Sequence, residues 1–206
     1  MNLIHDLFKE SRDPKKYSKA YIDNLIKLLE SLDHEAVAAI VQLFERTNEN
    51  KGRIYFAGNG GSASTCGHFV NDFHAGSLRH GGGGYRLIDL TSNIASLTAL
   101  ANDVGYENVF SHQLEQVIEP KDALVVISAS GNSINLIKAV DYAKAQGAKT
   151  VGLLGFDGGQ LKLKCDLSLV VSTLQGQYGP VEDIHLIINH LISTYLTFKK
   201  SQKEHQ

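Results

Sequence analysis

A hydroxyl-rich segment offers the first chemistry in this chain. Residues 128–133 read Ser-Ala-Ser-Gly-Asn-Ser and stand between an apolar run and a helical pattern. Glycine permits backbone turns that other residues avoid, and a helix N-terminus presents unpaired N–H groups and a positive dipole. Ser128, Ser130 and Ser133 add neutral hydroxyl groups, so we expect this loop to hold a phosphate monoester without a lysine or a metal ion. The alternative is that Ser130 or Ser133 only caps the helix.

A second glycine-rich segment has the same placement in the pattern. Residues 58–62, Gly-Asn-Gly-Gly-Ser, follow the first apolar run and contain neither the dinucleotide-binding nor the P-loop fingerprint. Because of this placement, candidate ligands for the same phosphate are Asn59, Gly60 and Ser62. The alternative is that the segment only forms a tight turn with a serine cap. The segment 155–159, Gly-Phe-Asp-Gly-Gly, is typical of a structural turn beside the binding site.

His68 and Asp72 form an i, i+4 pair in the helical pattern after the segment 58–62. Residues four apart lie on the same face of a helix, one turn above another. An imidazole and a carboxylate in this arrangement can orient an acid–base group or supply two metal ligands. The alternative is an ordinary surface contact. The position directly after a proposed ligand loop keeps both interpretations open.

The final helical segment carries a second set of ionisable side chains. Glu182 and His190 are separated by about 80° around a helix, near enough to converge on one concave site. His185 lies on a different face, about 140° from His190. Acidic residues in a first helical turn also complement the dipole, and a histidine among Leu, Ile and Asn can be simply buried and hydrogen-bonded. From these residues alone, the structural interpretation ranks first.

Five short apolar runs alternate with helical patterns along the chain. Because each crossover helix returns the chain to the same end of a sheet, the alternation predicts parallel strands. We expect an α/β fold with a doubly wound, five-stranded parallel sheet, preceded by a helical hairpin over residues 1–50. Residues 51–200 would then form one compact domain. The predicted strands cover residues 53–57, 85–90, 122–127, 149–154 and 167–171.

The glycine-rich and hydroxyl-rich segments all follow predicted strands. In doubly wound sheets, ligands bind outside the carboxyl ends of the strands. Segments 58–62, 91–93, 128–133 and 155–159 stand at those ends. We therefore predict the binding site at this edge of the sheet.

Composition narrows the classes of partner. The chain has 206 residues, with 20 Lys and Arg against 22 Asp and Glu, so its net charge of −2 gives no electrostatic reason to expect nucleic acid or an anionic membrane. Cys66 and Cys165 form no CxxC pair, which argues against a disulfide framework or a thiolate zinc knot. The first ten residues lack the continuous apolar region of a signal peptide, and no apolar run approaches ~18 residues. We expect a cytoplasmic protein with no nucleic acid and no membrane partner.

Several segments together resemble the sugar isomerase (SIS) domain family, and within it the phosphoheptose isomerases. The resemblance extends from about residue 15 to residue 198 and implies a flavodoxin-like SIS fold. The matching segments are Gly-Asn-Gly-Gly-Ser-Ala-Ser at 58–64 with His68 following, Leu-Ala-Asn-Asp-x-Gly-Tyr at 100–106, Ile-Ser-Ala-Ser-Gly-Asn-Ser-Ile-Asn-Leu-Ile-Lys-Ala at 127–139, and Gly-Leu-Leu-Gly-Phe-Asp-Gly-Gly at 152–159.

This resemblance implies roles for four ionisable residues. In phosphoheptose isomerases, a carboxylate one turn after the histidine and a histidine in the final helix act as the acid–base pair. These correspond to Asp72 and His190 here. Some members bind zinc through these two residues, the earlier histidine and a glutamine, so the resemblance implies one Zn²⁺ per subunit on His68, Asp72, Glu182 and His190. Family members are usually homotetramers, which makes a homotetramer the expected assembly.

The chain departs from the family pattern at several of these positions. Asp72 replaces the usual glutamate and is one methylene shorter, so it reaches less far. Glu182 replaces the usual glutamine and adds a negative charge, which favours a divalent cation. Asn93 stands where the family has an aspartate, and we place it with the substrate-binding residues. The family arginine falls on Gly76, which leaves Arg79 as its substitute.

Taken with the resemblance, these residues predict an aldose–ketose isomerase that acts on a heptose phosphate. The expected reaction converts sedoheptulose 7-phosphate to D-glycero-D-manno-heptose 7-phosphate. The two loops would hold the phosphate, with Asp72 as base and His190 as acid near C1 and C2. The alternatives are an SIS protein that senses a phosphosugar without catalysis, one that binds a replication-initiation protein, and an isomerase of an arabinose or hexosamine phosphate.

Overall fold

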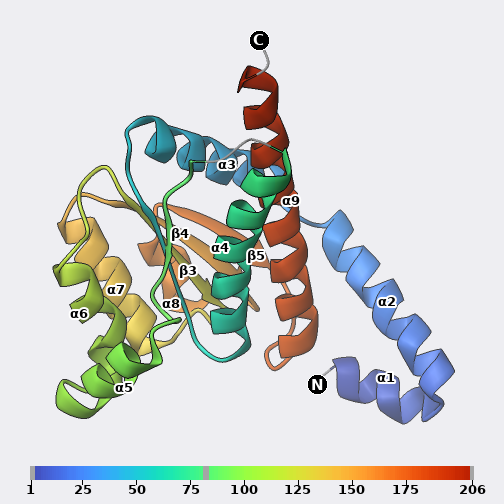
Figure 1. Cartoon of the computed structure of the whole chain (residues 1–206). Helices are drawn as coiled ribbons and strands as arrows, with labels where there is room; N and C mark the ends of the chain where they lie inside the picture. The colour runs from blue at the N-terminus through green and yellow to red at the C-terminus, as the bar shows by residue number, and fades with distance from the viewer. Residues whose placement is uncertain (1–2, 81–83, 205–206) are drawn as a thin grey trace.

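The computed structural model describes residues 3–80 and 84–204 and has a five-stranded parallel sheet at its centre (Figure 1). The strand order is β2-β1-β3-β4-β5, the flavodoxin-like order, and every neighbouring pair is parallel. This confirms the predicted fold class. The strands are β1 (Ile54–Gly58), β2 (Leu87–Asp89), β3 (Ala123–Ser128), β4 (Lys149–Gly155) and β5 (Leu167–Val171).

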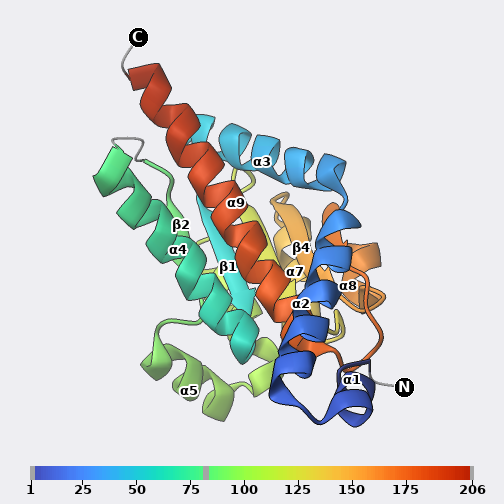
Figure 2. The ribbon, with the colours of Figure 1, turned by 90° about the vertical axis from the view of Figure 1, so that its right-hand side faces the viewer.

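Helices cover both faces of the sheet, as a parallel sheet with crossover connections requires (Figures 1 and 2). One face carries α3 (His34–Glu49), α4 (Gly61–His80) and α9 (Tyr178–Glu204). The other face carries α5 (Ile94–Asp103), the 3₁₀ turn η1 (Tyr106–Asn108), α6 (Val109–Glu115), α7 (Ile134–Ala145) and α8 (Gly159–Lys164).

Two hydrophobic cores result from the alternation of side chains along each strand. In β1, Phe56 faces the core under α3, α4 and α9, whereas Tyr55 and Ala57 face the core under α6 and α7. All residues of β1 and β3 are buried, because helices pack on both of their faces. The central strands therefore read as continuous apolar runs in the sequence.

The N-terminal segment is helical, as predicted, but its parts pack differently. Helix α3 begins after Asp33, whose carboxylate accepts a hydrogen bond from the backbone N–H of Ala36 at 2.9 Å, and its apolar side joins the core of the sheet. Helices α1 (Leu3–Ser11) and α2 (Pro14–Glu30) stand away from the sheet, and α2 has no fully buried residue (Figure 1). The predicted domain division at residue 50 stays a prediction.

Helices α4 and α9 pack against each other and bring side chains from distant parts of the sequence together. The two helices lie side by side and run in the same direction from the carboxyl edge of the sheet (Figure 2). Gly76 near the end of α4 leaves no room for a side chain against Thr197 of α9, because a Cβ there would lie 2.9 Å from the Thr197 hydroxyl oxygen. None of the described helices is long and apolar enough to cross a membrane.

Candidate active site

The first part of the site is a small cavity at the carboxyl ends of β1 and β3. Its volume is about 180 Å³. Its lining includes four of the serines predicted as ligands, and their binding role stays a prediction. They are Ser62, Ser128, Ser130 and Ser133.

The backbone of the 128–133 loop is held by the 155–159 turn. Gly131 has a φ of +64°, and a Cβ there would lie 2.0 Å from the carbonyl oxygen of Gly158. Leu161 donates its backbone N–H to the carbonyl of Gly131 at 3.0 Å, and Gln160 donates to the amide oxygen of Asn132 at 3.1 Å. The turn at residues 155–159 therefore holds the backbone of the 128–133 loop in place.

The loop hydroxyls help to turn the chain and keep further hydrogen-bonding capacity. Ser128 accepts a hydrogen bond from the N–H of Gly131 at 3.1 Å, and Ser130 accepts one from Asn132 at 3.3 Å. Ser133 occupies the N-cap position of α7, yet its side chain makes no capping hydrogen bond. Because a hydroxyl can both donate and accept, these three side chains keep donors for an anion in the cavity.

Asn59 also lines the cavity, but its amide links two loops. It exchanges hydrogen bonds with the amide of Asn135 at 3.0 and 2.9 Å. Tyr106 donates a hydrogen bond from its hydroxyl to Oδ1 of Asn59 at 2.7 Å. Asn135 is buried at the start of α7 and is not among the ligands predicted from the sequence. Its only signal was an amide in the first turn of the helix that follows the serine loop.

Two further predicted ligands lie outside the cavity lining. Asn93 is the N-cap of α5, and its amide oxygen accepts a hydrogen bond from the N–H of Ser96 at 3.1 Å. Gly60 adopts a φ of +56° in the turn that begins α4. Arg79, the predicted substitute for a family arginine, has a side chain outside the described part of the structure.

The second part of the site is a cluster of His68, Asp72 and His190 between α4 and α9. The two Nε2 atoms of the histidines lie 3.2 Å apart. Oδ1 of Asp72 lies 3.3 Å from Nε2 of His68, and Oδ2 lies 3.5 Å from Nε2 of His190. The structure thus brings the predicted acid–base pair together with the first histidine, within one chain.

This geometry suits proton transfer. Two Nε2 atoms at hydrogen-bond distance can share one proton, with one ring donating and the other accepting. The carboxylate of Asp72 accepts from either ring when that ring is protonated. Asp72 and His68 are partly buried, whereas His190 is more exposed, so a proton can pass between the cluster and a substrate at its open side.

The same three side chains fit a zinc ion. Tetrahedral zinc binds histidine nitrogen and carboxylate oxygen at about 2.1 Å, which places neighbouring ligand atoms about 3.4 Å apart. The separations of 3.2, 3.3 and 3.5 Å in the cluster agree with that spacing. Three protein ligands with an open fourth position are the arrangement of catalytic rather than structural zinc sites.

Glu182, the fourth predicted ligand, lies with the serine loop instead. It lines the serine cavity, and its carboxylate is so close to the start of α4 that a Cβ on Gly61 would lie 2.5 Å from Oε2. Gly61 precedes His68 by seven residues, about 10 Å along a helix. Within the described residues, the possible metal cluster contains His68, Asp72 and His190 without Glu182.

His185 has a structural place in α9. Its ring is almost fully buried, and its Nε2 lies 3.1 Å from the carbonyl oxygen of Leu154 in β4. Burial lowers the pKa of His185 to about 4, so the ring is neutral at physiological pH. It fastens α9 to the sheet between Glu182 and His190.

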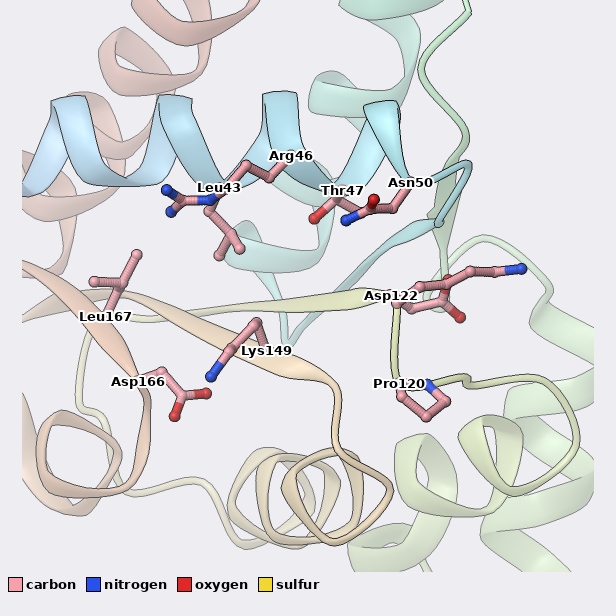
Figure 3. A pocket seen from close by; sticks show the side chains of 10 residues that line it. Leu43, Arg46, Thr47, Asn50, Pro120, Asp122, Lys149, Asp166 and Leu167 are labelled. Carbon is pink, nitrogen blue, oxygen red and sulfur yellow. The ribbon is translucent and has the colours of Figure 1, made fainter.

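A larger cavity, of about 510 Å³, lies at the opposite edge of the sheet (Figure 3). It is lined by α3 residues such as Arg46 and by residues at the amino ends of the strands. The latter include Asp122, Lys149 and Asp166. Asp122 accepts hydrogen bonds from the backbone N–H groups of residues 53 and 119, and Asp166 from Thr150. Ligands of such folds bind at the carboxyl ends, and this cavity lies at the amino ends.

Comparison with known proteins decides the family. The SIS domain family model matches residues 19–155. The phosphoheptose isomerase of Helicobacter pylori strain P12 is 39% identical over 173 residues, which cover 84% of this chain and 88% of the relative. The chain belongs to the phosphoheptose isomerase family. This confirms the predicted family and identifies the chain as an isomerase of the aldose–ketose class.

Solved structures agree with this placement among the phosphoheptose isomerases. The phosphoheptose isomerase of Neisseria gonorrhoeae has a TM-score of 0.79 and 27% identity, over 89% of this chain and 98% of that one. The sugar isomerase domain of the RpiR transcription factor from Sphaerobacter thermophilus has a TM-score of 0.65 at 18% identity, over 92% of each chain. The second likeness shows a shared fold alone.

Proposed function

We propose that this phosphoheptose isomerase family member interconverts sedoheptulose 7-phosphate and D-glycero-D-manno-heptose 7-phosphate. The observation that carries the proposal is the placement of two complementary sites along α9. Glu182 lines the serine cavity, and His190 lies eight residues further on, about 12 Å along the helix axis. An extended seven-carbon chain with a terminal phosphate spans a separation of this order. The phosphate would bind to the serine loop and the C1–C2 end would reach the cluster.

In the proposed mechanism, Asp72 acts as the base. It removes a proton from C1 of the ketose, and the electrons form the C1–C2 double bond of an enediol. His190 moves a proton between the oxygens on C1 and C2, and protonation at C2 then yields the aldose. Positioned proton transfer of this kind contributes about 10² to 10⁴ in rate. His68 lies at hydrogen-bond distance from His190 and helps to hold its ring.

We also propose one Zn²⁺ per chain, held by His68, Asp72 and His190. A bound ion would supply Lewis-acid polarisation of a substrate oxygen. Glu182, included in the expected ligand set, lies at the serine cavity, and we assign it to the phosphate side.

Elemental analysis tests the zinc proposal. Protein purified without a chelator and without a polyhistidine tag should contain close to one divalent ion per chain. The His68→Ala variant should contain much less, whereas His74→Ala, an exposed histidine on the same helix, should match the unchanged protein. Full isomerase activity in a chelator, with no bound ion, would contradict the proposal.

Isotope exchange tests the reaction itself. In D₂O, an enediol mechanism introduces deuterium from solvent at C1 or C2 of the heptose phosphate, which nuclear magnetic resonance detects. A coupled assay with sedoheptulose 7-phosphate measures turnover. A thermal-shift screen of arabinose, hexosamine and heptose phosphates, run beside it, separates a different substrate from a sensor that binds without turnover. Binding with no turnover of any sugar phosphate would reject the enzyme proposal in favour of a sensor.

A homotetramer is the proposed assembly. Ile187, Leu191 and Tyr195 are 39%, 41% and 51% exposed and repeat every fourth residue along α9, which makes an apolar stripe typical of an interface. Light scattering after gel filtration measures the mass of the assembly. The proposed compartment is the cytoplasm, in keeping with the free thiols of Cys66 and Cys165.

A further inference from the structure

Asn189 makes a contact with the acid–base cluster that no predicted role accounts for. It belongs to α9, next to His190, and its side chain is fully buried against α4. Its amide nitrogen donates a hydrogen bond to Oδ2 of Asp72 at 2.7 Å. This is shorter than the distance from Asp72 to either histidine nitrogen.

The other end of the same amide has no partner. Oδ1 of Asn189 is buried and accepts no hydrogen bond from the described residues. A buried carbonyl without a donor destabilises a fold, and an apolar side chain of similar shape would avoid that cost. The surrounding residues of α9 show that apolar side chains suit this helix face, because Ile188 and Ile192 are fully buried. Asn189 is therefore costly for stability, which points to a use for its N–H group.

The N–H group of Asn189 can hold the carboxylate of Asp72 in one orientation. The side chain of Asp72 is short, and its carboxylate must face the gap between the rings of His68 and His190. A freely rotating carboxylate would lose this orientation for part of the time. The amide of Asn189 engages Oδ2 and leaves Oδ1 directed at His68, so the plane of the carboxylate is set from α9.

We propose that Asn189 is a positioning residue that orients the carboxylate of Asp72 for proton transfer and metal binding. The inference rests on the proposed function in assigning Asp72 its role. Asn189 acts through Asp72 and needs no contact with substrate. It also links the two helices of the cluster, since the donor is on α9 and the acceptor on α4.

The first test separates positioning from stability. Asn189→Leu removes the unpaired carbonyl, which favours stability, and the donor to Asp72, which opposes it, so the free energy of unfolding should change little. The kcat for sedoheptulose 7-phosphate should nevertheless fall about 10- to 100-fold, the usual effect of losing a partner that orients an active-site ligand, with KM changed less than about threefold. Asn189→Ala removes the same donor if leucine proves too large, with some loss of stability from the cavity that it leaves.

Ile192→Val is the matched control in this test. It alters packing three residues further along α9 without touching the hydrogen bonds of Asp72. We expect a small loss of stability and an unchanged kcat. An Asn189→Leu protein with unchanged kcat would overturn the inference. So would a kcat loss that only follows a loss of stability, as judged against Ile192→Val.

The second test asks whether the Asn189 amide is needed because the side chain of Asp72 is short. In the Asn189→Leu background, Asp72→Glu lengthens the carboxylate and should recover at least part of the lost kcat. In the unchanged background, Asp72→Glu should bring no gain, because the longer chain competes for space with Asn189. A double variant no better than Asn189→Leu alone would contradict the proposed link to the length of Asp72.

The third test does not depend on the sugar substrate. Co²⁺ bound by two histidines and a carboxylate absorbs visible light, and a titration gives its affinity. Asn189→Leu should weaken Co²⁺ binding about 10- to 100-fold, and Ile192→Val should leave it unchanged. If the unchanged protein binds Co²⁺ but does not isomerise the heptose phosphate, the proposed substrate is wrong. The Co²⁺ titration alone then decides the role of Asn189. A protein that neither isomerises nor binds Co²⁺ overturns both proposals.

Discussion

The serine cavity and the histidine–aspartate cluster are built in different ways. The cavity takes three of its four serines from one strand–turn–helix segment, residues 128–133, and a neighbouring turn supports that segment. The cluster joins His68 of α4 to His190 of α9, which are 122 residues apart in the chain. The proposed phosphate-binding groups therefore arise from local backbone geometry, whereas the proposed acid–base groups depend on the packing of two helices.

The two regions also differ in charge. The cavity offers neutral hydroxyls and the carboxylate of Glu182, with no lysine or arginine in its lining. The cluster consists entirely of groups that gain or lose protons or bind a metal. We infer that changes in the cavity alter substrate affinity and that changes in the cluster alter turnover.

The largest effect should come from the cluster. Asp72→Asn removes the proposed base with little change of shape, so kcat should fall about 10²- to 10⁴-fold, with KM changed less than about threefold. His190→Ala should lower kcat in the same range. Steady-state kinetics on folded protein measures both, with His74→Ala as the control on α4. Wild-type turnover in either cluster variant would remove the acid–base assignment.

The next effect concerns α9, which carries groups of both regions. Burial lowers the pKa of His185 from 6.5 to about 4, so the folded protein favours the neutral ring. The stabilisation is complete above pH 6.5 and is lost as the pH falls. From this residue, the free energy of unfolding should drop by about 3 kcal/mol between pH 7 and pH 4. Urea denaturation of wild type and His185→Leu over this range measures the difference.

The two proteins should then show different pH slopes. His185→Leu should be less stable than wild type at pH 7, because the hydrogen bond between the ring and the carbonyl of Leu154 is lost. It should also lose less stability on acidification. His74→Ala removes an exposed histidine and should keep the wild-type slope. Equal slopes in wild type and His185→Leu would show that this ring does not titrate in the range.

A smaller effect is expected in the serine cavity. Ser130→Ala and Ser133→Ala each remove one neutral hydrogen bond to the proposed phosphate, worth about 1 kcal/mol, so KM should rise about fivefold. The kcat should stay near the wild-type value, because the lost contact is present in both the bound and the transition states. Ser168→Ala on β5 is the control. A loss of kcat with unchanged KM would place these serines with the chemistry instead.

The smallest effect should follow from Glu182→Gln. Removing a carboxylate beside a bound phosphate relieves repulsion between like charges, so KM should fall by about two- to fivefold at low salt and by less at high salt. Metal content should not change. A fall in bound metal would instead return Glu182 to the metal site, and the division between the two regions would need to be redrawn.

The sequence predicted the sheet well because central parallel strands are buried on both faces. Each of the five predicted strands matches a strand of the structure within about two residues. The short helix α6 and the turn η1 were not predicted, since seven and three residues leave little periodicity. The helical pattern over residues 15–50 also gave no sign that α3 would join the core and α2 would not.

The site was predictable where it is local. The serine loop could be identified from its composition and its place after a strand. Glu182 illustrates the limit, because its helical angle to His190 suggested convergence, although the two lie about 12 Å apart along the axis. Asn189 gave no signal, since a single amide among isoleucines and a histidine looks like any other buried polar residue.

Sequence alone determined the positions of the five parallel strands and placed the hydroxyl-rich loop at their carboxyl ends. These features depend on short-range patterns of burial, glycine and hydrogen-bonding side chains. Tertiary structure decided that His68, Asp72 and His190 meet, that Glu182 stays with the serines, and that Asn189 reaches Asp72. Those contacts depend on how α4 and α9 pack against each other, and that packing is a property of the whole core.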